Sequence, residues 1–134
     1  MTALTDNKEV SEKNSRIIEN PVAASTVIFK GAIVMSNATG YLAPAAALAD
    51  AVMAGIAYEK ADNANGADGD VNCKLLREGS FELSGSGFTQ ADLGLAVYAS
   101  DDQTVSTTQG TNEVEVGKIV QVVSASKVFV DIAK

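Results

Sequence analysis

The chain contains no histidine and no tryptophan, a single cysteine and two prolines, and its aromatic residues amount to four phenylalanines and three tyrosines. Without histidine it lacks the side chain best suited to proton transfer near neutral pH, and no Ser-His-Asp or Cys-His arrangement can form. One cysteine cannot make an internal disulfide, and no Cys/His spacing typical of a zinc site is present. We therefore expect that the chain is not an enzyme and that it holds no cofactor or metal.

Positive charge is also scarce, since 17 acidic residues face 10 basic ones and the formal net charge is −7. Nucleic-acid binding needs clustered Lys and Arg, so nucleic acid is not an expected partner. The longest apolar stretch, Tyr41–Ala57, is interrupted by Pro44 and Asp50 and falls short of the ~20 apolar residues of a membrane span. The N-terminus has no signal-peptide pattern. We expect no membrane partner, and synthesis in a reducing cytoplasm.

The apolar residues that are present, 46% of the chain, are enough for one domain in 134 residues, but many of them are alanine. Small side chains bury little area, so we expect a thin core whose stability is completed by association with partners. Cys73 alternates with Val71 and Leu75 on one side of a predicted strand, which indicates a buried thiol.

The sequence repeats one pattern twice. Gly31–Met35, a polar turn at 37–40 and Tyr41-Leu42 correspond to Gly94–Tyr98, a turn at 101–103 and Thr104-Val105. Val52–Ala57 then corresponds to Val114–Ile119, and Val71–Leu75 to Val128–Ile132. β-Branched residues in short alternating runs, separated by turn residues, are typical of strands. The pattern predicts an all-β fold, a small barrel or sandwich built from a duplicated strand unit.

Two segments of this β body favour short helical turns. Thr89 and Asp92 have capping-box spacing, which predicts one turn before Gly94. The alanine-rich segment 43–50 could form one or two helical turns or a loop lying on the body.

The first 23 residues differ from the rest because they are polar and charged, with few large apolar side chains. We interpret residues 1–23 as an extended N-terminal arm and residues 24–134 as the β domain; a simple disordered tail is the alternative. The apolar residues of the arm are candidate contacts with a neighbouring protein or with another subunit: Val10, Ile17, Ile18, Pro21 and Val22.

Two short motifs suggest ligands. Gly85-Ser86-Gly87 begins like a dinucleotide fingerprint, but its third glycine is replaced by Gln90. Asp68-Gly69-Asp70 opens like a calcium loop, but Cys73 stands at the required glycine. A loop is the better interpretation of the first motif, and the second leaves only weak calcium binding at Asp68 and Asp70 open.

The order of these elements resembles the capsid cement, or decoration, proteins of tailed bacteriophages. The resemblance spans about Thr26 to Ile132 and rests on the glycine-led strands, the segment Glu78–Leu83 and the run Thr89–Tyr98. It implies an all-β, commonly trimeric protein on the outer capsid surface of the virion. Such a protein binds the phage major capsid protein where subunits meet and stabilises the mature head, with no reaction and no cofactor.

A second hypothesis is a carbohydrate- or surface-binding β module on a virion or cell. Sugar rings stack on aromatic side chains, and Tyr41, Tyr58 and Tyr98 are the only tyrosines that could supply them. An enzyme of unrecognised type would instead need a cleft lined by carboxylates with shifted pKa values.

Overall fold

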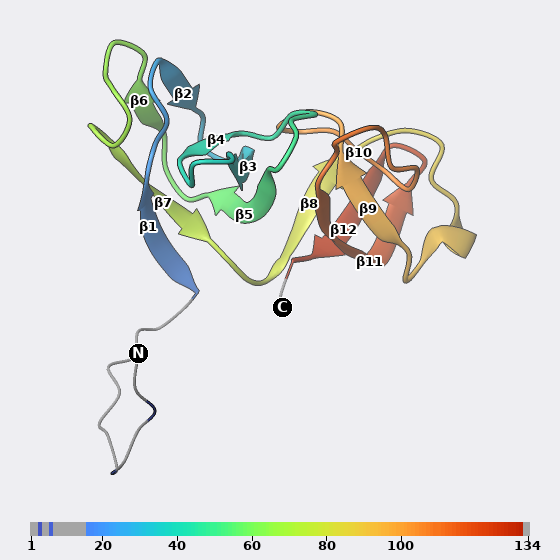
Figure 1. The fold of residues 1–134 in the computed structure, drawn as a ribbon. Coiled ribbons are helices and arrows are strands. Elements are labelled where there is room, and N and C mark those ends of the chain that lie inside the picture. Colours follow the sequence, from blue (N-terminus) through green and yellow to red (C-terminus); the bar gives the residue numbers. More distant parts are fainter. Residues whose placement is uncertain (1–2, 4–5, 7–15, 133–134) are drawn as a thin grey trace.

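A computed structural model of the chain describes residue 3, residue 6 and residues 16–132, and nearly all of its regular structure is β-strand. Figure 1 shows three sheets in a row, with β2 and β6 at one end and strands β8 to β12 at the other. The predicted all-β fold is confirmed. Of the two predicted architectures it is sandwich-like, because the strands do not close into a barrel. The elements are β1 (Ile17–Pro21), β2 (Thr26–Ile28), β3 (Ile33–Ser36), β4 (Leu42–Pro44), β5 (Val52–Ala57), β6 (Ala61–Asn63), β7 (Asn72–Leu76), β8 (Ser80–Ser84), the 3-10 turn η1 (Gln90–Asp92), β9 (Ala96–Ala99), β10 (Val105–Ser106), β11 (Glu115–Ser124) and β12 (Lys127–Asp131).

The two five-stranded sheets have the same topology. The first sheet has the order β1-β7-β5-β3-β4, and the second has the order β8-β12-β11-β9-β10. All neighbouring strands are antiparallel, and each repeat also has one isolated parallel bridge, Val22 to Leu42 in the first and Ser84 to Thr104 in the second. Residues 16–132 therefore contain two repeats, 16–77 and 79–132, which confirms the predicted duplication.

Individual hydrogen bonds also recur between the repeats. The Gly31 amide donates to Ala57 O, and the Gly94 amide donates to Ile119 O, both at 2.9 Å. Both glycines have a left-handed φ, +86° and +88°, which a residue with a side chain rarely adopts. This requirement explains why a glycine precedes the corresponding strand in each repeat.

Each repeat also has a β-bulge beside a second glycine that recurs in both repeats. The register shifts between Val34 and Met35 in the first sheet and between Glu115 and Gly117 in the second. A Cβ on Gly55 would lie 2.5 Å from the Leu76 carbonyl oxygen, and one on Gly117 would clash with the carbonyl of Asp131. The close approach of the neighbouring strand at each bulge thus accounts for the second repeated glycine.

One part of the predicted alignment is wrong by two residues. Leu75 lies opposite Ala57 and Val130 lies opposite Ile119, so Leu75 corresponds to Val130 rather than to Ile132. Alternation has a period of two, and a shift of two residues preserves the same inward and outward pattern. The sequence pattern alone could not distinguish the two alignments.

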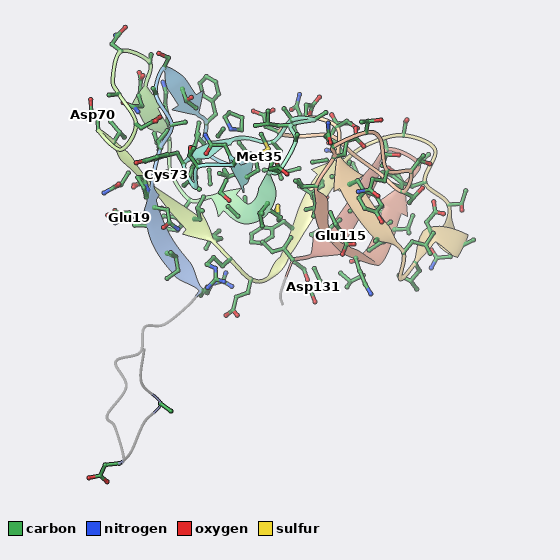
Figure 2. The ribbon with its side chains drawn as sticks, viewed as in Figure 1. Glu19, Met35, Asp70, Cys73, Glu115 and Asp131 are labelled. Carbon is green, nitrogen blue, oxygen red and sulfur yellow. The ribbon has the colours of Figure 1, made fainter. Side chains whose placement is uncertain are left out.

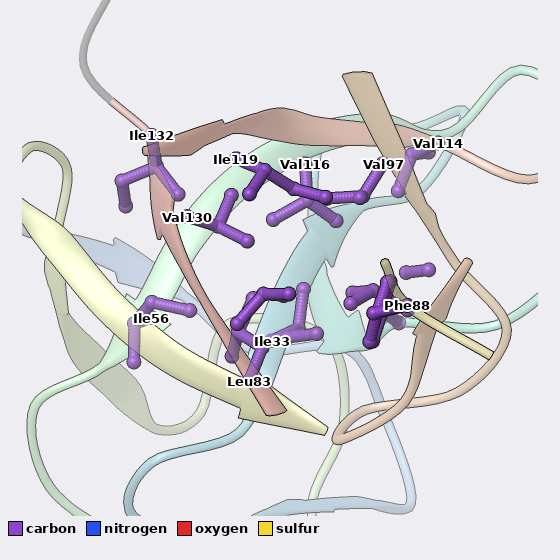
Figure 3. Close-up of a cluster of buried hydrophobic side chains, with 14 residues drawn as sticks. Ile33, Ile56, Leu83, Phe88, Val97, Val114, Val116, Ile119, Val130 and Ile132 are labelled. Atoms are coloured by element: carbon purple, nitrogen blue, oxygen red, sulfur yellow. The ribbon is translucent and has the colours of Figure 1, made fainter. Parts of the chain in front are cut away.

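The repeats differ in what covers them. Only the first repeat has the two-stranded sheet of β2 and β6, which lies against its core cluster of Val22, Ile28, Ala32, Val34, Leu42, Ala57, Ala61, Cys73 and Leu75. The larger cluster joins the repeats, because Ile33 and Ile56 of the first sheet pack among the buried residues of the second, as Figure 3 shows. The inter-repeat contact is therefore part of the main hydrophobic core.

The predicted local elements have mixed outcomes. The turn after Thr89 is present as η1, and Asp92 Oδ2 accepts a hydrogen bond from the Thr89 amide at 3.0 Å. The segment after Pro44 contains no helix, so the loop alternative is the right one. Ile17–Pro21, which the sequence placed in the arm, form β1 and pair with β7, so these residues belong to the β body.

Candidate interaction surface

The candidate contact residues lie in different environments. Ile17, Ile18 and Pro21 lie on β1, an outer strand of the first sheet; Ile17 is 42% exposed, and the other two are partly buried. Val22 is fully buried in the core of the first repeat, and its amide donates to Val71 O at 2.9 Å. Its selection as a contact is therefore wrong, because its side chain packs inside its own chain. Val10 lies outside the described residues.

Several of the other large apolar side chains on the surface lie near the strand-leading glycine of one repeat or the other. Tyr58 directly follows Ala57, which accepts the hydrogen bond from Gly31. Val120 directly follows Ile119, which accepts the one from Gly94, so Val120 is the equivalent of Tyr58 in the second repeat. Three further exposed apolar residues lie close to these glycines in the sequence. Phe29 lies two residues before Gly31 in the first repeat, and Leu93 and Leu95 flank Gly94 in the second. Each repeat therefore presents an apolar surface beside its left-handed glycine.

A groove of ≈ 430 Å³ lies beside Gly31, where the two repeats meet, and we call it the junction groove. Ile56 and Leu76 form its base, Phe81 of the second repeat and Tyr58 border it, and Lys30 places a positive charge at the rim. Sequence analysis missed this groove, because its residues come from β5, β7, β8 and a loop that are far apart in the chain.

The carboxylates of Asp68 and Asp70, the candidate calcium ligands, accept hydrogen bonds from backbone amides. Asp68 Oδ1 accepts from the Ala24 amide at 2.7 Å, and Asp70 Oδ2 accepts from the Ala67 amide at 2.9 Å. Figure 2 shows Asp70 at the β2–β6 end, far from Glu115 and Asp131 of the second sheet. Within residues 16–132 and the two described residues before them, no group of three or more His, Cys, Asp or Glu could hold a metal ion.

Cys73 is buried in the core of the first repeat, as predicted. Burial raises the pKa of its thiol above the ordinary 9.0, and the nearby carboxylates of Glu59 and Glu19 raise it further. The folded state therefore favours the neutral thiol.

This raised pKa predicts a loss of stability in alkaline solution. The neutral Cys73 thiol contributes its full stabilisation when the pH is below the thiol pKa of the unfolded chain. This contribution is lost as the pH rises from that pKa through the higher thiol pKa of the folded state. The slope cannot exceed about 1.4 kcal/mol per pH unit. Urea unfolding at a series of pH values from 7 to 11, compared with Cys73→Ala, measures it; an identical pH dependence in both proteins would contradict the prediction.

Among the described residues, no helix is long and apolar enough to cross a membrane. Comparisons with models of known protein families, with curated proteins and with solved structures give no match for this chain.

Proposed function

We propose that the chain is a structural virion protein that binds the outside of a tailed-phage capsid between major capsid subunits and stabilises the mature head. The observation that carries the proposal is the pair of similar β units joined by a shared core. A body made of two packed β units can span the boundary between neighbouring capsid subunits. The resemblance of residues 26–132 to capsid cement proteins supports the same function.

The surface chemistry supports this proposal. Nine large apolar side chains are exposed among the described residues, although the chain is otherwise acidic: Ile17, Phe29, Leu48, Val52, Tyr58, Leu93, Leu95, Val120 and Val123. Exposed apolar groups that gather in patches mark protein-binding surfaces. In this proposal the chain is not an enzyme; its partners are the major capsid protein and further copies of itself in a trimer.

The test uses capsids assembled from the major capsid protein of the phage that, in this proposal, carries the gene for this chain. Purified protein should co-sediment with expanded capsids and not with their precursor form, and decorated heads should withstand a higher temperature before releasing DNA. A density map should place the protein on the outer surface where subunits meet. Failure to bind expanded capsids at any salt concentration would refute the proposal, and glycan-array binding lost on Tyr58→Ala would favour the carbohydrate-binding alternative.

A further inference from the structure

The junction groove differs from the rest of the surface in its aromatic content. Phe29 lines the adjoining hollow, which shares Lys30 and Gly31 with the groove, and is 59% exposed; Tyr58, which lines the groove, is 46% exposed. The Lys60 ammonium lies 5.3 Å from the centroid of the Phe29 ring, a cation–π distance. Exposed aromatic rings contribute little to the stability of a monomer but dominate binding energy at protein interfaces.

Among the described residues, Lys30 is the one charged residue that lines the groove, on a protein that is acidic as a whole. Lys60 lies outside the lining, over the ring of Phe29, which precedes Lys30 in the chain. No acidic residue within 16–132 lines the groove itself. Glu59 lies close enough to Cys73 to raise its pKa, and Asp102 lines the adjoining hollow together with Phe29, Lys30 and Gly31. An occupant with carboxylates would complement the two lysines.

The second repeat has an equivalent groove of ≈ 390 Å³, and its chemistry is different. Strand pairing makes Lys118 and Asp131 the equivalents of Ile56 and Leu76, and Val120 is the equivalent of Tyr58. The fold therefore tolerates charged residues at the positions that Ile56 and Leu76 occupy in the first repeat. Packing against the core explains the apolar Ile56 and Leu76, but it does not explain the exposed rings of Phe29 and Tyr58.

We propose that the junction groove is the docking site for an extended segment of the major capsid protein in which an apolar side chain is flanked by carboxylates. The apolar side chain lies between Tyr58, Leu76 and Phe81, and the carboxylates pair with Lys30 and Lys60. This inference rests on the proposed function and assigns the capsid-facing surface to the first repeat at its junction with the second.

The test compares two pairs of variants with a matched control. Phe29→Ser with Tyr58→Ser removes the rings, and Lys30→Glu with Lys60→Glu reverses the charge. The control, Leu93→Ser with Val120→Ser, removes equally exposed apolar groups at the equivalent surface of the second repeat. All these side chains are exposed or lie at a groove rim, so circular dichroism should show an unchanged fold. Affinity for expanded capsids is measured by co-sedimentation at two salt concentrations.

We expect the first pair to weaken capsid binding roughly tenfold or more, and the control to bind like the original chain. The charge-reversed pair should also bind more weakly and lose most of its salt dependence. Unchanged affinity in both groove pairs would overturn the inference while leaving the proposed function intact. A change in sedimentation of the free protein without a change in capsid binding would likewise overturn it, because the groove would then be a contact between copies of this chain. If the original chain fails to bind, the proposed function itself falls.

Discussion

Asn63→Asp is expected to destabilise the folded chain by about 3–5 kcal/mol at pH 7, since the substitution places an uncompensated charge in the interior. The Asn63 side chain is 2% exposed, and its Nδ2 donates to the carbonyl oxygens of Val22, Ala23 and Ala67 at 3.3, 2.9 and 3.0 Å. Three acceptors around one nitrogen require a donor there. A carboxylate would turn an oxygen toward these oxygens and repel them.

The pH dependence identifies the cause. Burial without a donor raises the pKa of the introduced carboxyl in the folded state, so its destabilising effect is present at neutral pH. The effect diminishes as the pH falls through that raised pKa and vanishes below about 3.9, the ordinary pKa of aspartic acid. Urea unfolding from pH 4 to pH 8 measures the change.

Asn63→Ala provides the control, because it removes the same hydrogen bonds without adding charge. It should cost about 1–3 kcal/mol at every pH. The prediction fails if Asn63→Asp is as stable as the original chain at pH 7, or if its stability follows the same pH curve as Asn63→Ala. Either result would mean that water reaches this side chain in the folded protein.

Ile33→Ala is expected to cost about 2–5 kcal/mol, the range for truncating a large buried aliphatic side chain. Ile33 is fully buried, pairs with Ile56 across β3 and β5, and packs among side chains of the second sheet, including Val97 and Val116. The cavity would lie between the repeats, where neither sheet can move inward without disturbing the other. Both repeats should therefore lose stability together.

Thermal and urea unfolding, followed by circular dichroism, measure this effect. Val52→Ala is the matched control, since Val52 lies on β5 of the same sheet but is 62% exposed, and it should change stability by about 0.5 kcal/mol or less. Equal effects of the two substitutions would show that Ile33 does not link the repeats. Two separate unfolding transitions in the original chain would show the same.

Much of the fold could be predicted from local patterns. Alternating β-branched residues located most strands of the β body, but not β6, which has no β-branched residue. The repeated glycines identified the duplication, because left-handed turns and close strand contacts require glycine wherever they recur. The sequence could not show which residues of β12 correspond to those of β7 in the other repeat, since a two-residue shift leaves the alternation unchanged. The assignment of Ile17–Pro21 to the arm failed because their partner, β7, lies more than fifty residues further along the chain.

The junction groove was beyond local inference for a related reason. Phe29, Tyr58 and Phe81 each resemble ordinary strand or loop residues when considered singly. Only the packing of the second sheet against the first brings Phe81 to the edge of Ile56 and Leu76. Val22 illustrates the reverse case, because a valine beside a proline in a polar segment gives no sign that a loop and two strands will enclose it.

Joining the two β units in one polypeptide has a consequence for how such a protein can evolve. Two identical chains that associate must change the same residue in both members, so any aromatic added to one groove is added to the other. Here Tyr58 and Val120 are encoded separately. One unit can therefore acquire adhesive residues while its twin keeps charges that preserve solubility.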